Sequence, residues 1–248
     1  LAQELEALNR ERQQLTAQAL ARCREMVDTS QPLLFAGAPD FHPGVVGIVA
    51  GKLAEEFYRP TIVMEIGEKV SRGSCRSIPE FNIIAALSQC APLFDRFGGH
   101  PQAAGFTIAN KNLAELEERL LSLAKEQLAG LDLRPRLTTD AAIHLSQLNR
   151  EVLPWISRMA PLGYGNPAPV FLTRGITVSE SRSFGNNDVH LQLRLTESGV
   201  TWQAIGFNLA IPREVLSQPL DMVYRLGTSR WQGDERLRLE VLDLRPSG

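Results

Sequence analysis

Apolar residues recur at helical spacing over the first 31 residues of the chain, a stretch that contains neither glycine nor proline. The apolar positions on one face are Leu1, Leu5, Leu8, Leu15, Ala19 and Met26, and they are interrupted by Arg12 and Arg22. The pattern predicts one long amphipathic helix over residues 1–31. An ordinary amphipathic helix of this kind lies with its apolar face along the domain that follows.

Between residues 32 and 130, short apolar runs rich in β-branched residues alternate with helical patterns. Strands are predicted at residues 33–36, 61–66, 70–76 and from Gly105 onward, and helices begin near Pro43, after Ser77 and at Asn110. Gly44, Gly47 and Gly51 lie near helical spacing and predict a flat helix face for close packing. The alternation predicts an α/β domain over residues 32–130, with a mixed sheet flanked by helices.

Residues 131–160 are predicted to form a bridge with a short strand near 137–141 and a helix from Ser146. After residue 161 helical patterns nearly stop, and strands are predicted at residues 175–183, 189–196, 200–207, 222–229 and 236–244. Hairpin turns are expected at residues 185–188 and 232–234, and a short helix at 212–216 separates the third and fourth strands. This order predicts a five-stranded OB-fold β-barrel over residues 161–248.

Composition excludes several classes of protein. With 44% apolar and 22% charged residues the chain can bury a core, and no apolar run approaches the length of a membrane span. Three widely spaced cysteines fit a reducing cytoplasm rather than a disulfide framework or a zinc site. The net charge is −2, and 22 of the 26 basic residues are arginine. Arginine suits phosphate contacts, but a GC-rich genome that favours arginine codons explains the same count, so charge does not distinguish these two explanations.

Two polar runs combine the residue types of a phosphate-binding pocket. The first is Arg72 to Ser77 (RGSCRS), in which Ser77 and Glu80 have the spacing of a helix capping box. The second is Phe97 to Gly105 (FGGHPQAAG), in which paired glycines precede His100. An arginine, hydroxyls at a helix start, and glycines that admit a ligand to the backbone favour phosphate binding. The alternative is an ordinary turn beside a surface histidine.

These runs resemble the DHH-associated domain of the DHH phosphoesterase superfamily. Runs at residues 42–53, 161–171 and 231–237 narrow the resemblance to the RecJ family, exonucleases that degrade single-stranded DNA from its 5′ end in DNA repair and recombination. Members carry an N-terminal domain whose Asp and Asp-His-His motifs hold manganese or magnesium. This sequence contains no Asp-His-His, and its four scattered histidines have no carboxylate at metal-ligand spacing. The resemblance implies a substrate-gripping fragment that binds no metal and is inactive alone.

The resemblance also implies that the helix of residues 1–31 connects the metal-binding domain to the domain that follows, and it assigns roles to individual residues. Ser74, Arg76 and Ser77 would hold backbone phosphates, while Gly98, Gly99 and His100 would reach the phosphate near the scissile bond. His100 would then act as an electrostatic stabiliser or proton donor. His42, at a predicted helix start, would face the same cleft or simply cap its helix. The implied partners are single-stranded DNA, the enzyme's own N-terminal domain and single-strand-binding protein, with no membrane.

OB barrels hold single strands by stacking bases on aromatic side chains above a basic groove. The candidates for stacking are Phe184, Trp202, Tyr224 and Trp231, and the candidate arginines are Arg182, Arg194, Arg225, Arg230 and Arg238. Each aromatic is alternatively a core residue of the barrel. The run Gly163 to Pro169 (GYGNPAP) is either a domain hinge or a DNA contact.

Two other functions are compatible with these patterns. The chain could be a stand-alone module that binds single-stranded nucleic acid or protein, or a fragment of a phosphoesterase for short oligonucleotides or a cyclic dinucleotide. A second binding platform favours longer single strands, because a small substrate needs no barrel.

Overall fold

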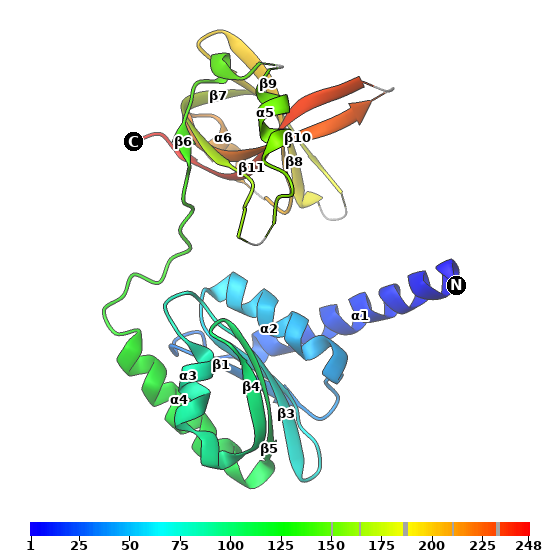
Figure 1. The fold of residues 1–248 in the computed structure, drawn as a ribbon, viewed down its shortest axis with the longest axis vertical. Helices are drawn as coiled ribbons and strands as arrows, with labels where there is room; N and C mark the ends of the chain where they lie inside the picture. The colour runs from blue at the N-terminus through cyan, green and yellow to red at the C-terminus, as the bar shows by residue number, and fades with distance from the viewer. Residues whose placement is uncertain (150, 164, 186–187, 210, 232–233) are drawn as a thin grey trace. The chain divides into compact units, whose positions relative to one another are not determined.

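The structure, a computed structural model, comprises two compact units, Leu1–Pro135 and Arg136–Gly248 (Figure 1). It describes residues 1–149, 151–163, 165–185, 188–209, 211–231 and 234–248, and for residues 153, 229–231 and 234–236 only the backbone. Among the helices of this described part, none has the length and apolar character needed to cross a membrane.

The first unit is built on a mixed five-stranded sheet with the order β1-β2-β3-β5-β4. The strands are β1 (Leu34–Ala38), β2 (Thr61–Glu65), β3 (Val70–Arg76), β4 (Phe94–His100) and β5 (Ala103–Ala109). β1 runs parallel to β2, and the remaining pairs are antiparallel. The predicted α/β class is confirmed, although β4 falls on a glycine-rich run for which no strand was predicted.

Two pairs of helices bury the two faces of this sheet. Helices α1 (Ala2–Met26) and α2 (Pro43–Phe57) form one core with β1 and β2. Helices α3 (Ile83–Gln89) and α4 (Leu113–Gln127) form the larger core on the other face, after the 3-10 turns η1 (Ala91–Leu93) and η2 (Asn110–Asn112). Each face thus obtains its apolar cover from a different part of the sequence.

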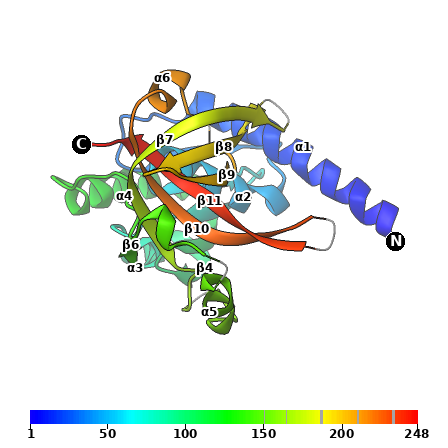
Figure 2. The same ribbon diagram turned by 90° about the horizontal axis from the view of Figure 1, so that it is seen from above.

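The N-terminal helix has two halves with different surroundings. Its second half lies on the domain, because Ala19 and Cys23 are buried against α2 and Arg24 pairs with Glu56 at 2.8 Å. Its first half projects beyond α2 in both views, with the apolar side chains of Leu1, Leu5 and Leu8 exposed (Figures 1 and 2). The predicted end at residue 31 was wrong, since a turn in which Asp28 accepts from the Ser30 amide and hydroxyl ends the helix at Met26.

Two predicted helix starts also differ from the structure. Ser77 does not cap α3; the cap is Asn82, whose Oδ1 accepts from the Ala85 amide at 3.2 Å. A helix from Ser77 would place the residue before Pro79 in helical conformation, which the proline ring disfavours. Asn110 likewise caps no helix, because its Oδ1 accepts from the Ser71 hydroxyl at 2.7 Å while its side-chain nitrogen donates to the Gly67 carbonyl in the loop between β2 and β3.

The second unit is a closed barrel of five strands, as predicted. The strands are β7 (Val170–Phe184), β8 (His190–Glu197), β9 (Val200–Gly206), β10 (Leu220–Trp231) and β11 (Asp234–Pro246), with α6 (Arg213–Leu216) between β9 and β10. Neighbours pair in the order β7-β8-β9-β11-β10, and β10 closes the circle by pairing with β7. Leu191, Leu193 and Leu195 face the core, as their alternation indicated. Both predicted hairpin turns include residues outside the described part.

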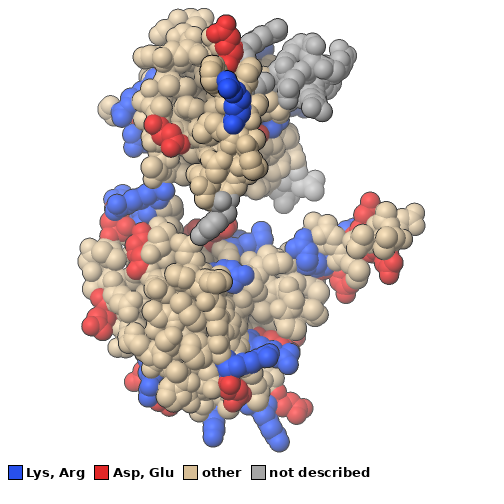
Figure 3. All heavy atoms as spheres, viewed as in Figure 1, with Lys and Arg blue, Asp and Glu red and all other residues tan. Residues whose placement is uncertain are grey.

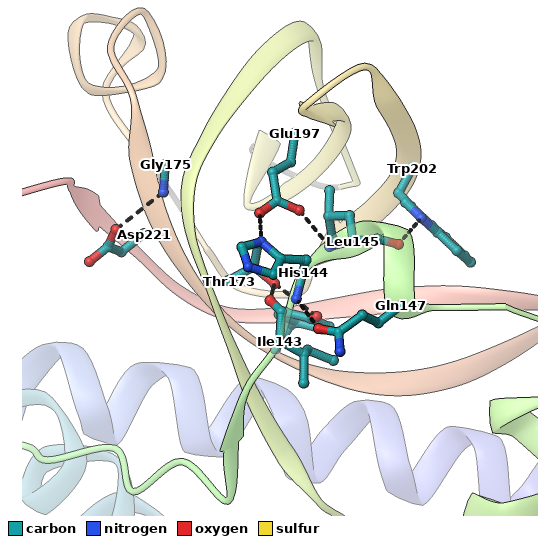
Figure 4. Close-up of polar contacts among 10 residues, drawn as sticks. Ile143, His144, Leu145, Gln147, Thr173, Gly175, Glu197, Trp202 and Asp221 are labelled. Atoms are coloured by element: carbon teal, nitrogen blue, oxygen red, sulfur yellow. Dashed lines mark hydrogen bonds and ion pairs between the residues drawn. The ribbon is translucent and has the colours of Figure 1, made fainter.

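The segment before the barrel is bound to it rather than being a separate bridge. Strand β6 (Ala141–Ala142) pairs with β7, and the turn η3 (Leu145–Gln147) precedes α5 (Val152–Arg158). Leu145 and Leu148 are buried in the barrel core. A carboxylate oxygen of Glu197 lies 2.6 Å from Nδ1 of His144, and the indole nitrogen of Trp202 donates to the Leu145 carbonyl at 3.1 Å (Figure 4). We call residues 139–148 the strap. The predicted bridge of residues 131–160 was therefore too long, and the connection between the two units consists of residues 131–138.

Candidate nucleic-acid interface

One face of the first unit's sheet is covered by α1 and α2 only in part: the helices cover β1 and β2, and part of this face remains exposed. The core beneath those helices contains residues of β1 and β2 and none from the described residues of β4 or β5. The strand register places three cross-strand rows on this area: Arg72, Thr107 and Arg96; Ser74, Gly105 and Gly98; and Arg76, Ala103 and His100. We call these nine residues the open sheet face. It brings together both runs that predicted a phosphate site.

Ser74 and Arg76 lie where the glycine face of α2 meets β3. A side chain at Gly47 would come within 3.0 Å of the Ser74 hydroxyl and 3.3 Å of the Arg76 guanidinium. The predicted close packing by glycines is therefore confirmed, and it occurs against the candidate phosphate ligands. Nη1 of Arg76 donates to the Cys75 carbonyl at 2.8 Å and to Ser74 at 3.3 Å. Its Nε and Nη2 groups have no partner among the described residues, so they can donate to an anion.

His100 ends β4 in the same row as Arg76, with Ala103 between them. Arg76 and His100 are therefore two strand spacings apart, about 10 Å between their backbones. His100 is exposed to solvent. Gly99 makes this arrangement possible, because its φ is +151° and a side chain there would lie 2.4 Å from the Ala103 carbonyl oxygen. The paired glycines are thus the end of a strand, and the turn follows them at residues 101–102.

Ser77 supports the hairpin that carries His100. Its amide donates to the Gln102 carbonyl at 2.9 Å, and its hydroxyl donates to the Phe81 carbonyl at 2.7 Å. Because that hydroxyl is occupied, Ser77 holds the β4–β5 turn beside β3 rather than offering the ligand contact that was predicted. His42 is the N-cap of α2, and its Nδ1 accepts from the Gly44 amide at 3.0 Å. That cap was one of its two predicted roles.

The described residues contain no group of three His, Cys, Asp or Glu side chains that could hold a metal ion. Burial also keeps the thiols protonated: the three cysteines are buried and unpaired, and burial raises the pKa of Cys23 to about 11 and raises that of Cys75 as well. A metal used by this protein therefore finds no ligand set in the described part of the chain.

A second candidate surface lies on the barrel, where side chains from four strands or strand ends form a row. The ring of Phe184 is 5.2 Å from that of His190, which is 5.5 Å from that of Phe207. The guanidinium of Arg238 lies over Phe207 at 5.7 Å. We call these four residues the aromatic row. Half-exposed rings next to an arginine are the chemistry that stacks bases of a single strand.

The other stacking candidates fare differently. Tyr224 is fully buried, its hydroxyl lies 3.0 Å from that of Thr173, and burial raises its pKa to about 12, so it is a core residue and its predicted role was wrong. Trp202 is half-buried because its indole holds the strap. The side chains of Trp231 and Arg230 lie outside the described part.

The predicted basic residues of the barrel are dispersed. Arg182 and Arg194 line a shallow hollow of about 450 Å³ over β7, β8 and β9, where Arg194 also pairs with Glu180 at 3.4 Å. Arg225 is exposed, and Arg238 pairs with Glu240 at 2.7 Å. On the face shown in Figure 3, basic and acidic side chains are interspersed on both units. Within the run at residues 163–169, Gly163 and Asn166 form an isolated antiparallel bridge, and the Asn166 side chain donates to the Met159 and Pro161 carbonyls.

Sequence reasoning missed His190 and Phe207 in the aromatic row, and Arg72 and Arg96 on the open sheet face. The strand alternation of β3 already placed Arg72 on the same face as Ser74 and Arg76. Arg96 could not be found without knowing that β4 is a strand. Phe207 was included in a predicted strand, but only the structure shows that half of its surface is exposed.

Comparison with known proteins agrees with the two units. Residues 30–130 match the DHHA1 domain, and residues 139–243 match the RecJ OB domain. The chain is therefore a DHHA1 domain followed by a RecJ OB domain, and over both units it is similar to proteins of the RecJ family. The predicted resemblance is confirmed.

Individual relatives extend this match over nearly the whole chain. It is 31% identical to the single-stranded-DNA-specific exonuclease RecJ of Bacillus subtilis, over 98% of this chain and 32% of that protein. It is also 31% identical to the RecJ of Thermus thermophilus, over 99% of this chain and 34% of the relative. The crystal structure of T. thermophilus RecJ in complex with Mg²⁺ superposes with a TM-score of 0.79 at 26% identity, covering 99% of this chain and 37% of that one. The chain thus spans about a third of these relatives.

Proposed function

We propose that this chain is the strand-gripping part of a metal-dependent exonuclease that degrades single-stranded DNA. The observation that carries the proposal is the cross-strand row of Arg76 and His100 with Ser74 beside it, on a sheet face whose floor is glycine and alanine. Magnesium or manganese is present in the T. thermophilus crystal structures. Residues outside the described part of this chain would hold it, because the described residues contain no group of side chains that could bind a metal ion.

The residues of the open sheet face divide the work of holding a phosphate. Arg76 offers free N–H groups in a planar fork, which match two oxygens of one phosphate, and Ser74 adds a hydroxyl. The absence of side chains at Gly98 and Gly105 lets the DNA strand approach the backbone of the sheet. His100 donates to a phosphate oxygen on the opposite side, where charge increases as the phosphodiester is attacked. The metal ions would supply Lewis-acid activation of that phosphate and of the attacking water.

The barrel and the N-terminal helix complete the proposed role. The aromatic row provides stacking surfaces for bases farther along the strand. The exposed apolar stripe of Leu1, Leu5 and Leu8 is suited to packing against the domain that holds the metal.

Binding of this chain is expected to favour single-stranded over duplex DNA, because stacking requires unpaired bases. Fluorescence anisotropy with matched single-stranded and duplex oligomers measures the preference. Phe207→Ala should weaken single-strand binding about tenfold, within the range for one stacked base, and leave the melting temperature unchanged because the ring is half exposed. Tighter binding of the duplex would instead point to a barrel that docks protein or recognises shape.

The chain alone is expected to digest no DNA with either metal. Adding the DHH domain of a relative in trans should restore some digestion of a labelled strand, provided that the exposed half of α1 docks on it. Leu5→Glu in that stripe should reduce the restored rate, while Arg10→Glu, which adds negative charge to the same helix outside the stripe, should not. Manganese-dependent digestion by the pure chain would contradict the assignment.

A further inference from the structure

The open sheet face has a second basic end, at a distance from the row that contains Arg76. Arg72 precedes Arg76 by four residues on β3, which corresponds to about 13 Å along a strand. Two adjoining hollows, of about 480 and 330 Å³, meet there, and Arg72, Arg96 and Thr107 line both of them. Nothing in the role proposed above uses this end of the face.

The chemistry of this end is that of an anion site. Arg96 donates through Nε to the Thr107 hydroxyl at 3.2 Å, which fixes its guanidinium over the face. Arg72 lies in the same cross-strand row, with Thr107 between the two arginines. Both arginines are exposed, and neither forms an ion pair with any described carboxylate, although Glu65 and Asp95 line the larger hollow. Two cations with free donors thus lie on either side of Thr107 in one cross-strand row, an arrangement suited to a phosphate.

The floor between the two basic ends is uncharged and open. Gly98 and Gly105 form the middle row, and a side chain added at Gly98 would meet no atom within 4 Å. The smaller hollow extends over these glycines from the Arg72 end. A polyanion with charges at regular intervals can therefore contact both ends while the backbone between them crosses the open middle.

We infer that Arg72 and Arg96 form a second phosphate subsite for the same single strand that Ser74 and Arg76 hold. The inference rests on the proposed function, because it takes the strand as its ligand. The separation of about 13 Å corresponds to about two to four nucleotide steps, given about 3.4 Å per step in a stacked strand and more when it is extended. A dinucleotide is too short to engage both ends with full contacts, whereas a hexanucleotide spans them.

Oligothymidylates of two and six nucleotides, titrated against the whole 248-residue chain at low ionic strength, test the inference. In the double variant Arg72→Gln with Arg96→Gln, binding of the hexanucleotide should fall about tenfold, and the salt dependence should become shallower by about 0.7 for each phosphate that the variant no longer neutralises. Dinucleotide binding should stay as in the unaltered chain. Arg76→Gln should weaken both ligands. Arg119→Gln, on α4 beneath the opposite face, is the control for net charge and should change neither.

The outcomes separate the two proposals. If Arg76→Gln weakens binding while the double variant binds the hexanucleotide normally, the second subsite is refuted and the proposed function stands. If neither variant changes binding, the open sheet face is not the interface, and both proposals fail. An equal loss of dinucleotide and hexanucleotide binding in the double variant would also refute a separate subsite. Thermal melts of each variant confirm that the exposed substitutions leave the fold intact.

Discussion

Replacing His100 with alanine in a full-length RecJ-family enzyme that contains this chain is expected to lower the digestion rate about a hundredfold. The proposed contact of His100 strengthens as charge develops on the phosphate, so its loss appears in the rate of the chemical step more than in binding. Because His100 is exposed at a strand end, the free energy of unfolding should change by less than about 0.5 kcal/mol. Single-turnover digestion beside equilibrium binding measures the two effects.

The Arg76→Ala variant is the comparison for His100→Ala, because it should affect binding rather than the rate of the chemical step. A bidentate clamp on a phosphate acts on the bound strand as well as on the transition state, so this variant should chiefly weaken binding. A His100→Ala enzyme that digests at the normal rate, or that loses activity only because it unfolds, would show that the histidine has no role in the reaction.

Gly99→Ala is expected to destabilise the first unit by about 3 kcal/mol, a shift of about 10 °C in its melting temperature. The substitution puts a β-carbon on a residue with a φ of +151°, at 2.4 Å from the Ala103 carbonyl oxygen and 2.5 Å from Cα of Ala104. Those contacts are to backbone, so no side-chain rotation relieves them. The hairpin that carries His100 must then distort.

The neighbouring glycine provides the control. Gly98→Ala adds the same methyl group to the same strand, at a residue where it meets no atom within 4 Å. Its melting temperature should equal that of the unaltered chain, while strand binding weakens because the methyl group rises from the floor of the open sheet face. Calorimetry on both variants decides the matter, and equal melting temperatures for the two would contradict the backbone clash.

The sequence pattern predicted those parts of the fold where each strand has one buried and one exposed face. The barrel strand that contains Leu191 and Leu195 alternates strictly between apolar and polar residues, and predicted turns and a short helix marked the ends of the other strands. β3 was predicted with its observed bounds for the same reason. The candidate phosphate-binding residues Ser74, Arg76 and His100 came from the composition of their two runs and from the resemblance of those runs to the DHH-associated domain.

What could not be predicted depends on contacts between distant residues. β4 contains two glycines and exposes most of its side chains, so its identity as a strand comes from pairing with β5 rather than from its own composition. Tyr224 and Phe207 are both aromatic residues of the barrel region, and only the position of Thr173 and the end of β9 determine that one is buried and the other exposed. The local sequence pattern around a residue does not indicate which distant residues will contact it.

The strap has a consequence for how such proteins can be rearranged during evolution. A gene fusion that begins the barrel at residue 161 would omit Leu145 and Leu148 from its core and leave Glu197, only 8% exposed, without the amide and imidazole it contacts. Residues 131–138 belong to no helix or strand, so a crossover there separates two complete folding units. A barrel exchanged with a crossover in this segment keeps the strap, and with it Leu145 and Leu148 in the barrel core.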